Sequence, residues 1–254
     1  MSKISIIIPV LNEIEMIGSL LRHLVDSSNS KNITEIIVID GGSSDGTQDI
    51  VRDFHSKFKD PKTTLRQAQC DSSGLINPSK LVLLNSPKGR AKQMNIGAKH
   101  AKGDILYFLH ADSFPPKDFD QHIINEVSKG NNAGCFRMQF DSSHWWLRLA
   151  SWLTQFSWRA CRGGDQSLFI TKTLFNEIGG YDESYTIYED NILINELYKR
   201  KQFVVINKKI RTSARLYKKV GVWKLQYHFW AIYVKRWFGA SADDMLVYYK
   251  KNIS

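Results

Sequence analysis

The sequence predicts an α/β protein built on a doubly wound, mostly parallel sheet, with helices on both faces and an aromatic helical extension at the C-terminal end. Two observations support this class. Short apolar runs rich in β-branched residues alternate with segments of helical period over residues 1–130, an order typical of parallel sheets. The chain has 254 residues, 43% of them hydrophobic and 24% charged, which is enough for one domain with a large core.

The expected elements follow one another in a regular order in the first half. Residues 4–10 form an unbroken apolar run typical of a buried strand, and residues 14–26 carry apolar side chains at helical spacing. The same criteria predict strands at 35–40, 80–85, 104–110 and 133–140, and helices at 45–58, 89–101 and 117–128. We expect Ser44 or Asp45 to cap the second helix, and the polar segment 59–79 to form a surface loop or insertion.

The second half is less regular and differs in composition. We expect a Trp-rich helix at 145–159, a short strand at 166–171, a helix at 190–200, two short strands and a long aromatic helix at 222–238. All seven tryptophans lie between Trp145 and Trp237, and the segment between Glu196 and Asp243 has twelve cations and no acid, in a chain of net charge +10. Such a surface attracts phosphates, nucleic acid or anionic lipid headgroups.

The cysteines and the apolar segments indicate the cellular compartment of the protein. The three cysteines have no metal-like spacing, which suggests reduced thiols in a cytoplasmic protein. The apolar run at the N-terminus is too short for a signal peptide, and no stretch of the sequence reaches the ~20 apolar residues that cross a bilayer. We therefore expect a cytoplasmic protein.

Two of the expected strands are followed by a turn that begins with an acidic residue: Asp40 at the end of the second strand and Asp112 after the fourth. Ligands of open α/β sheets bind outside the carboxyl ends of the strands, so both acids point to where a ligand would lie. His110 precedes Asp112 by two positions, a spacing that lets both side chains reach one cation. Two such carboxylates suit a nucleotide that carries a diphosphate and its metal.

Five segments resemble, in this order, the family 2 glycosyltransferases of the GT-A fold: SIIIPVLNE, IIVIDGGSSDGT, GRAKQMNIGAKHAKGDILYFLHADS, GGDQSLFI, and GGYDE followed by YEDNILINEL. The resemblance implies inverting transfer of a sugar from a nucleoside-diphosphate sugar to an acceptor hydroxyl, aided by a divalent cation, Mn²⁺ or Mg²⁺. In these terms residues 1–254 form a single glycosyltransferase domain, with a nucleotide-binding half at 1–130 and an acceptor-side half at 131–254.

The donor site follows from the resemblance. It places Pro9, Leu11 and Glu13 in the nucleoside pocket and Asp40 against the base; an Asx turn or a helix cap is the alternative for Asp40. Arg90 opens a predicted helix, where it could reach the donor phosphates or base. A cation at a helix N-terminus is electrostatically unfavourable, which favours a functional arginine over a solvated one.

The HAD segment, His110 to Asp112, occupies the place of the family's DXD metal motif. A neutral imidazole in place of the first acid suits Mn²⁺ better than Mg²⁺, which prefers oxygen ligands. His110 as a plain polar residue at a strand end is the alternative. Arg215, in the late RTSARLY segment, could meet the diphosphate or remain a solvated surface charge.

The catalytic candidates are the adjacent acids Glu189 and Asp190. In an inverting transfer a carboxylate must take the proton of the attacking hydroxyl, and the resemblance gives this role of general base to Asp190. The alternative is an acid that caps the helix at 190–200. By the same resemblance Gly164, Asp165 and Gln166 shape the acceptor side of the cleft, with a simple loop turn as the alternative.

The aromatic helices allow two interpretations, packing against the sheet or an interfacial surface where Trp lies at headgroup depth and Lys or Arg meets anionic lipid. The second would suit a lipid-linked or hydrophobic acceptor and peripheral attachment to a membrane. Two other functions compete with sugar transfer. A nucleotidyltransferase would show a glycine-rich, basic loop after the first strand, which VLNEIEMIGS lacks, and a nucleic-acid-binding protein would show a recognition motif, which is absent. We therefore expect no nucleic-acid partner.

Overall fold

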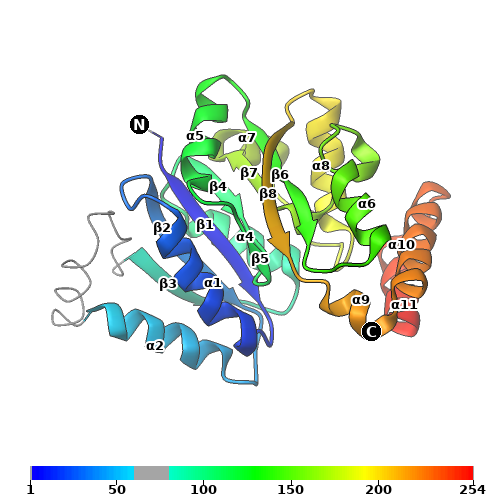
Figure 1. The fold of residues 1–254 in the computed structure, drawn as a ribbon, viewed down its shortest axis with the longest axis horizontal. Helices are drawn as coiled ribbons and strands as arrows, with labels where there is room; N and C mark the ends of the chain where they lie inside the picture. Colours follow the sequence, from blue (N-terminus) through cyan, green and yellow to red (C-terminus); the bar gives the residue numbers. More distant parts are fainter. Residues whose placement is uncertain (1, 60–79, 254) are drawn as a thin grey trace.

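The computed structural model describes residues 2–59 and 80–253, which form an eight-stranded sheet covered by helices (Figure 1). The strands are β1 (Ile4–Val10), β2 (Ile33–Asp40), β3 (Leu81–Asn85), β4 (Ile105–Phe108), β5 (Ser113–Phe114), β6 (Ala133–Phe140), β7 (Leu168–Thr171) and β8 (Val204–Thr212). The loop expected at 59–79 lies outside the described residues, except for Lys59 at the end of α2.

The helices alternate with the strands in the first half and gather at the C-terminal end. They are α1 (Ile14–Ser27), α2 (Thr47–Lys59), α4 (Arg90–His100), α5 (Phe119–Ser128), α6 (Trp145–Leu153), α7 (Lys172–Ile178), α8 (Glu189–Lys199), α9 (Arg215–Val220), α10 (Val222–Trp237) and α11 (Ala242–Asn252). Short 3₁₀ helices span Arg159–Cys161 and Gly164–Gln166. No helix in the described part of the chain is long and apolar enough to cross a bilayer.

The strand order is β3-β2-β1-β4-β7-β6-β8-β5. The first four strands in this order run parallel, β7 is antiparallel to both of its neighbours, β8 runs parallel to β6, and β5 is antiparallel to β8. The predicted doubly wound, mostly parallel sheet is therefore confirmed. Since β2 and β4 flank β1, the turns that follow these three strands emerge side by side at one edge of the sheet.

The two faces of the sheet carry separate apolar clusters because successive residues of a strand point to opposite sides. Ile6 and Ile8 of β1 pack with α1 and α5, whereas Ile7 between them packs with α4, α7 and α8. α1, for example, contributes residues at helical spacing such as Leu20 and Leu24, both of which are fully buried. The expected helices on both faces are therefore present.

Several expected elements of the second half differ from the observed ones. The Trp-rich helix α6 ends at Leu153 rather than near residue 159. The two short strands expected after α8 are one strand, β8, whose pairing with β6 shifts register between Phe136 and Arg137. The polar residues at this irregularity interrupt the apolar pattern, so the strand looked divided. The strand β5 and the helices α7, α9 and α11 had no sequence prediction.

The C-terminal aromatic extension consists of α9, α10 and α11, which lie at one end of the molecule beyond α6 (Figure 1). Their buried contacts are few: Leu225, Ile232, Met245 and Ile253 form one small cluster. Most of the large side chains of α10 are therefore left on the surface.

Candidate functional site

The candidate site lies in the turns at the carboxyl ends of β1, β2 and β4. Asp40 ends β2 and is 1% exposed. Its carboxylate accepts hydrogen bonds from the amides of Gly42 (3.0 Å) and Ser43 (2.9 Å), from the Ser43 hydroxyl and from Gln48 Nε2 (2.7 Å). Burial alone would raise the pKa of Asp40, but the bonds from Ser43 and Gln48 outweigh it and lower that pKa. The ionised carboxylate forms the Asx-type turn that was the alternative role for this residue, and its contact with a nucleotide base stays a prediction.

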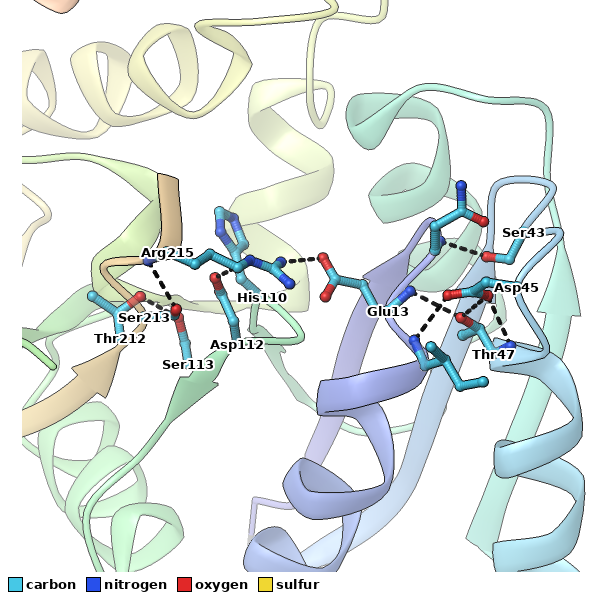
Figure 2. Close-up of polar contacts among 12 residues, drawn as sticks. Glu13, Ser43, Asp45, Thr47, His110, Asp112, Ser113, Thr212, Ser213 and Arg215 are labelled. Carbon is cyan, nitrogen blue, oxygen red and sulfur yellow. Dashed lines mark hydrogen bonds and ion pairs between the residues drawn. The ribbon is translucent and has the colours of Figure 1, made fainter. Parts of the chain in front are cut away.

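The turn after β1 is bonded to the turn after β2. Asn12, in the left-handed region with φ 56°, donates its amide to Ser43 Oγ at 2.9 Å. The Glu13 amide donates to Thr47 Oγ1 at 2.9 Å, and Asp45, two residues before α2 begins, accepts the Thr47 amide at 2.9 Å (Figure 2). This bonding fixes the backbone that carries Glu13.

Pro9 and Leu11 stand beside these turns, each half-buried. Both therefore retain surface at the carboxyl edge of β1, where the sequence predicts the nucleoside pocket. Their contact with a nucleoside stays a prediction.

Arg215 joins the two acids that face each other across the site. Its guanidinium forms an ion pair with Glu13, and its Nε lies 3.6 Å from Asp112 Oδ2 (Figure 2). It arrives from far along the chain because β5 pairs with the end of β8, and the Ser213 amide donates to the Asp112 carbonyl at 3.2 Å. Burial, and then the nearby carboxylates, raise the pKa of Asp112 to about 6 against the opposing charge of Arg215.

His110 lies between two further acids. Its Nδ1 is 3.6 Å from Asp165 Oδ1, and its Nε2 is 3.9 Å from Asp190 Oδ2. Burial, and then the positive charge of Arg90, lower the pKa of His110 to about 3. The imidazole is therefore neutral near pH 7 and keeps a lone pair that could bind a cation. Among the residues that the structure describes, no three His, Cys, Asp or Glu side chains gather around one point as a complete metal site would need.

Glu189 and Asp190 open α8 at the centre of this arrangement. Glu189 is 1% exposed, and neither of its carboxylate oxygens has a hydrogen-bond partner. Arg90 Nη1 lies 3.2 Å from Glu189 Oε1 and 3.6 Å from Asp190 Oδ2, so one guanidinium faces both acids. Burial, and then the charge of Glu189, raise the pKa of Asp190, while Arg90 opposes the shift. Arg90 was expected at the donor; its contacts in this structure are to the two acids.

Gly164 lies directly against the Asp190 carboxylate. A Cβ at this position would come 2.0 Å from Asp190 Oδ2 and 3.1 Å from His110 Cε1, so any other residue here would displace the Asp190 carboxylate. Asp165, the next residue, is exposed beside His110. Gln166 is instead buried, with its side chain accepting from Arg162 Nη1 at 2.6 Å. Of the three expected acceptor-side residues, the first two reach the site and Gln166 holds the turn beneath it.

Two features of the site have little or no signal in the sequence. The first is the set of hydrogen bonds that joins the two turns at Asn12, Ser43 and Thr47. Its signal in the sequence is weak: Asn, Ser and Thr are residue types whose side chains often bond to the backbone of turns. The pairing of Arg90 with the acids of α8 joins positions about one hundred residues apart in the chain, and no local pattern indicates it.

The fold and the site define an α/β protein with buried acids at the carboxyl edge of its sheet, and the comparisons with known proteins identify the family. The family model described as Glycosyl transferase family 2 matches residues 5–188. The chain belongs to this family, and the resemblance found in the sequence is confirmed.

Among curated proteins, the probable glycosyltransferase YdaM of Bacillus subtilis is 26% identical over 212 residues, which cover 77% of this chain and 46% of that protein. The undecaprenyl-phosphate 4-deoxy-4-formamido-L-arabinose transferase of Edwardsiella ictaluri is 29% identical over 150 residues, covering 58% of this chain and 41% of that protein. The chain thus spans less than half the length of these two relatives.

Solved structures show the same fold. The S. aureus TarS fragment 1–349 in complex with UDP superposes with a TM-score of 0.61 at 16% identity, covering 83% of this chain and 60% of that one. The mannosyltransferase PcManGT of Pyrobaculum calidifontis, in complex with GDP-Man and Mn²⁺, also gives a TM-score of 0.61, at 17% identity, covering 91% of this chain and 60% of that one. The GT-A fold that the resemblance implied is confirmed.

Proposed function

We propose that this chain is an inverting glycosyltransferase that moves a sugar from a nucleoside-diphosphate sugar to an acceptor hydroxyl, with Asp190 as the general base. The observation that carries the proposal is the buried carboxylate pair at the start of α8, held by one arginine at the carboxyl edge of the sheet. Inversion requires a single displacement in which the acceptor hydroxyl loses its proton as it attacks. A carboxylate whose pKa is raised by burial and by a neighbouring acid is a stronger base for this step.

The donor site is proposed at the turns after β1, β2 and β4. Pro9, Leu11 and Glu13 would surround the nucleoside, with Asp40 beneath the base; the UDP and GDP-Man complexes of proteins of the same fold support a nucleotide donor. Arg215 would contact the diphosphate, since its guanidinium already lies between two carboxylates that a donor and its cation would engage.

A divalent cation is proposed to bind with the donor diphosphate. Asp112 supplies a carboxylate oxygen and His110 a neutral nitrogen, a pair that suits Mn²⁺ better than Mg²⁺. The described residues offer no third side chain, so a cation held by these two would take its remaining ligands from the diphosphate and water. The Mn²⁺ in the PcManGT complex supports the same class of cofactor. A cation bound there would neutralise charge on the departing diphosphate.

The acceptor and the location are also proposals. The large exposed aromatic side chains of α6 and α10 and the acid-free basic segment support a lipid-linked or hydrophobic acceptor, reached by peripheral attachment to the cytoplasmic face of an anionic membrane. The name of the Edwardsiella relative, a transferase acting with undecaprenyl phosphate, supports an acceptor of this class.

A donor screen tests the activity. Thermal shifts with UDP, GDP and a short oligonucleotide, with and without Mn²⁺, should show stabilisation by one nucleoside diphosphate and none by the oligonucleotide. Release of that nucleoside diphosphate from its sugar donors is then measured with membrane extract as a source of acceptor. Stabilisation by the oligonucleotide alone would contradict the proposed enzyme.

A further inference from the structure

A hollow of about 970 Å³ lies between β6, α6, β8 and α9, and none of the proposed donor or catalytic residues lines it. Beside it, the second half of β6 has no strand partner on the edge next to β7, because β7 pairs only with Ala133 and Gly134. Side chains of α6 and of the turn after it take the place of that strand. Thr154 Oγ1 accepts the Met138 amide at 2.9 Å, and Ser151 Oγ accepts the Phe140 amide at 3.1 Å. The helix is thereby held beside the strand.

Positive charge dominates the hollow. Its lining includes the cations Arg137, Arg148, Lys209 and Lys218 and one acid, Asp141. None of these five forms an ion pair with any residue that the structure describes. Arg137 donates from Nη1 to the neutral amide of Asn207 at 2.6 Å, and its buried Nε has no hydrogen-bond partner. Unpaired guanidinium and ammonium groups around one polar space match a phosphate, to which they form charge-assisted hydrogen bonds.

One wall of the hollow is apolar. Leu149 and Trp152 of α6 line it and are 38% and 52% exposed, so their surface faces solvent as well as the basic groups. A free phosphate would use only the cations, whereas a phosphate with an attached hydrocarbon chain would also cover these two side chains. The composition of the lining therefore favours an amphipathic phosphate over an inorganic one.

The apolar surface continues from the hollow across the neighbouring helix. Trp145 of α6 lies 5.7 Å from Trp223 of α10 between ring centroids, and the two are 61% and 52% exposed. Further along α10, Trp230 is 51% exposed and Trp237 is 87% exposed. α6 and α10 contain no acid, while Arg148, Lys224, Lys235 and Arg236 lie along them. Tryptophan beside Lys and Arg is the composition of surfaces that rest at the headgroup level of a bilayer.

We propose that this hollow binds the phosphate group of an anionic lipid, with Trp152 and the exposed tryptophans of α10 placed in the headgroup layer. The inference rests on the proposed attachment to a membrane, and it adds the site and the chemical class of the ligand. It is separate from the donor site, because the hollow and the donor site share no lining residue.

Vesicle co-sedimentation tests the inference. The vesicles are phosphatidylcholine alone or mixed with phosphatidylglycerol, and the test variant combines Arg148→Glu with Lys218→Glu. The matched control combines Lys31→Glu with Lys117→Glu, which reverses two exposed cations outside the hollow that also lack ion pairs in the described structure. We expect the wild type and the control to bind the mixed vesicles, and the test variant to bind them at least about tenfold more weakly. The milder pair Arg148→Gln and Lys218→Gln should show a smaller loss.

Two further arms separate the possible outcomes. The thermal shift by nucleoside diphosphate must stay the same in every variant, which shows that the donor site is folded and that a loss of lipid binding belongs to the hollow. Equal vesicle binding by the test variant and its control would overturn the lipid site in the hollow. A third variant, Trp237→Ser, tests membrane attachment by itself: if it alone releases the protein from the vesicles, attachment is supported but the hollow is not its lipid site. Stabilisation of the wild type by inorganic phosphate, with unchanged vesicle binding in the test variant, would assign the hollow to soluble phosphate instead.

Discussion

Substitution of Gly164 by alanine tests whether the position of the Asp190 carboxylate matters for catalysis. The added Cβ would come 2.0 Å from Asp190 Oδ2 and 2.7 Å from its Cγ. Real Cβ atoms essentially never lie within 3.0 Å of such neighbours. The carboxylate must therefore move by about 1 Å or more, or rotate away. A displacement of this size of a catalytic group costs on the order of 10²-fold in rate.

Gly163 provides a matched control. A Cβ at Gly163 meets no atom within 4 Å, and the backbone there is extended, with φ −165°, so alanine fits without strain. The same chemical change is thus made at adjacent positions, and only one of them touches the acid. Alanine in an unstrained position restricts the unfolded chain, so Gly163→Ala should be as stable as the wild type or more stable by about 0.4–1 kcal/mol.

The assay compares the two variants in nucleoside-diphosphate release at saturating donor, together with calorimetry of nucleoside-diphosphate binding. We expect Gly163→Ala to keep the wild-type kcat and Gly164→Ala to lose on the order of 10²-fold, with donor affinity kept in both. Equal activity of the two variants would refute the reasoning, because the acid beside Gly164 would then have no role that depends on its position.

Three other predictions concern charge. The logarithm of kcat should fall as the pH falls through the raised pKa of Asp190, because the base must be ionised; Arg90→Gln should move this acid limb to higher pH, and an unmoved limb would assign it to another group. Asp112→Ala should abolish cation-dependent binding of nucleoside diphosphate, and His110→Ala should weaken it more with Mn²⁺ than with Mg²⁺; equal affinities in EDTA would show that no cation takes part. Arg215→Ala should weaken nucleoside-diphosphate binding about tenfold, whereas Arg211→Ala, an exposed arginine nearby, should not; calorimetry that finds both variants alike would contradict a diphosphate contact.

The sequence predicts the fold best where one local pattern decides the structure. The apolar run at 4–10 and the helical spacing at 14–26 correspond to β1 and α1, because burial on both faces of a strand leaves an unbroken apolar run and burial of one helix stripe leaves a helical period. β5 escapes such reasoning because it has two residues and exists through its pairing with β8. α7 and α9, with seven and six residues, are too short to show a helical period.

The site is predicted in part for the same reason. Asp112 and the acids of α8 lie at element ends that the pattern locates, and the structure brings Asp190 close to His110. What the sequence does not show is which partner each group finds. The contacts of Arg90, the burial of Gln166 and the need for glycine at position 164 arise from approaches between distant segments.

The most direct test of the central claim is to measure both nucleoside-diphosphate affinity and sugar-transfer rate in the Asp190→Asn variant. Asparagine keeps the size of the side chain but cannot take a proton from the acceptor, so the variant should bind nucleoside diphosphate with the wild-type affinity. Its transfer rate should fall on the order of 10²–10⁴-fold. If Asp190→Asn instead loses nucleoside-diphosphate affinity, or transfers sugar at the wild-type rate, Asp190 is not the general base and the proposed mechanism is wrong.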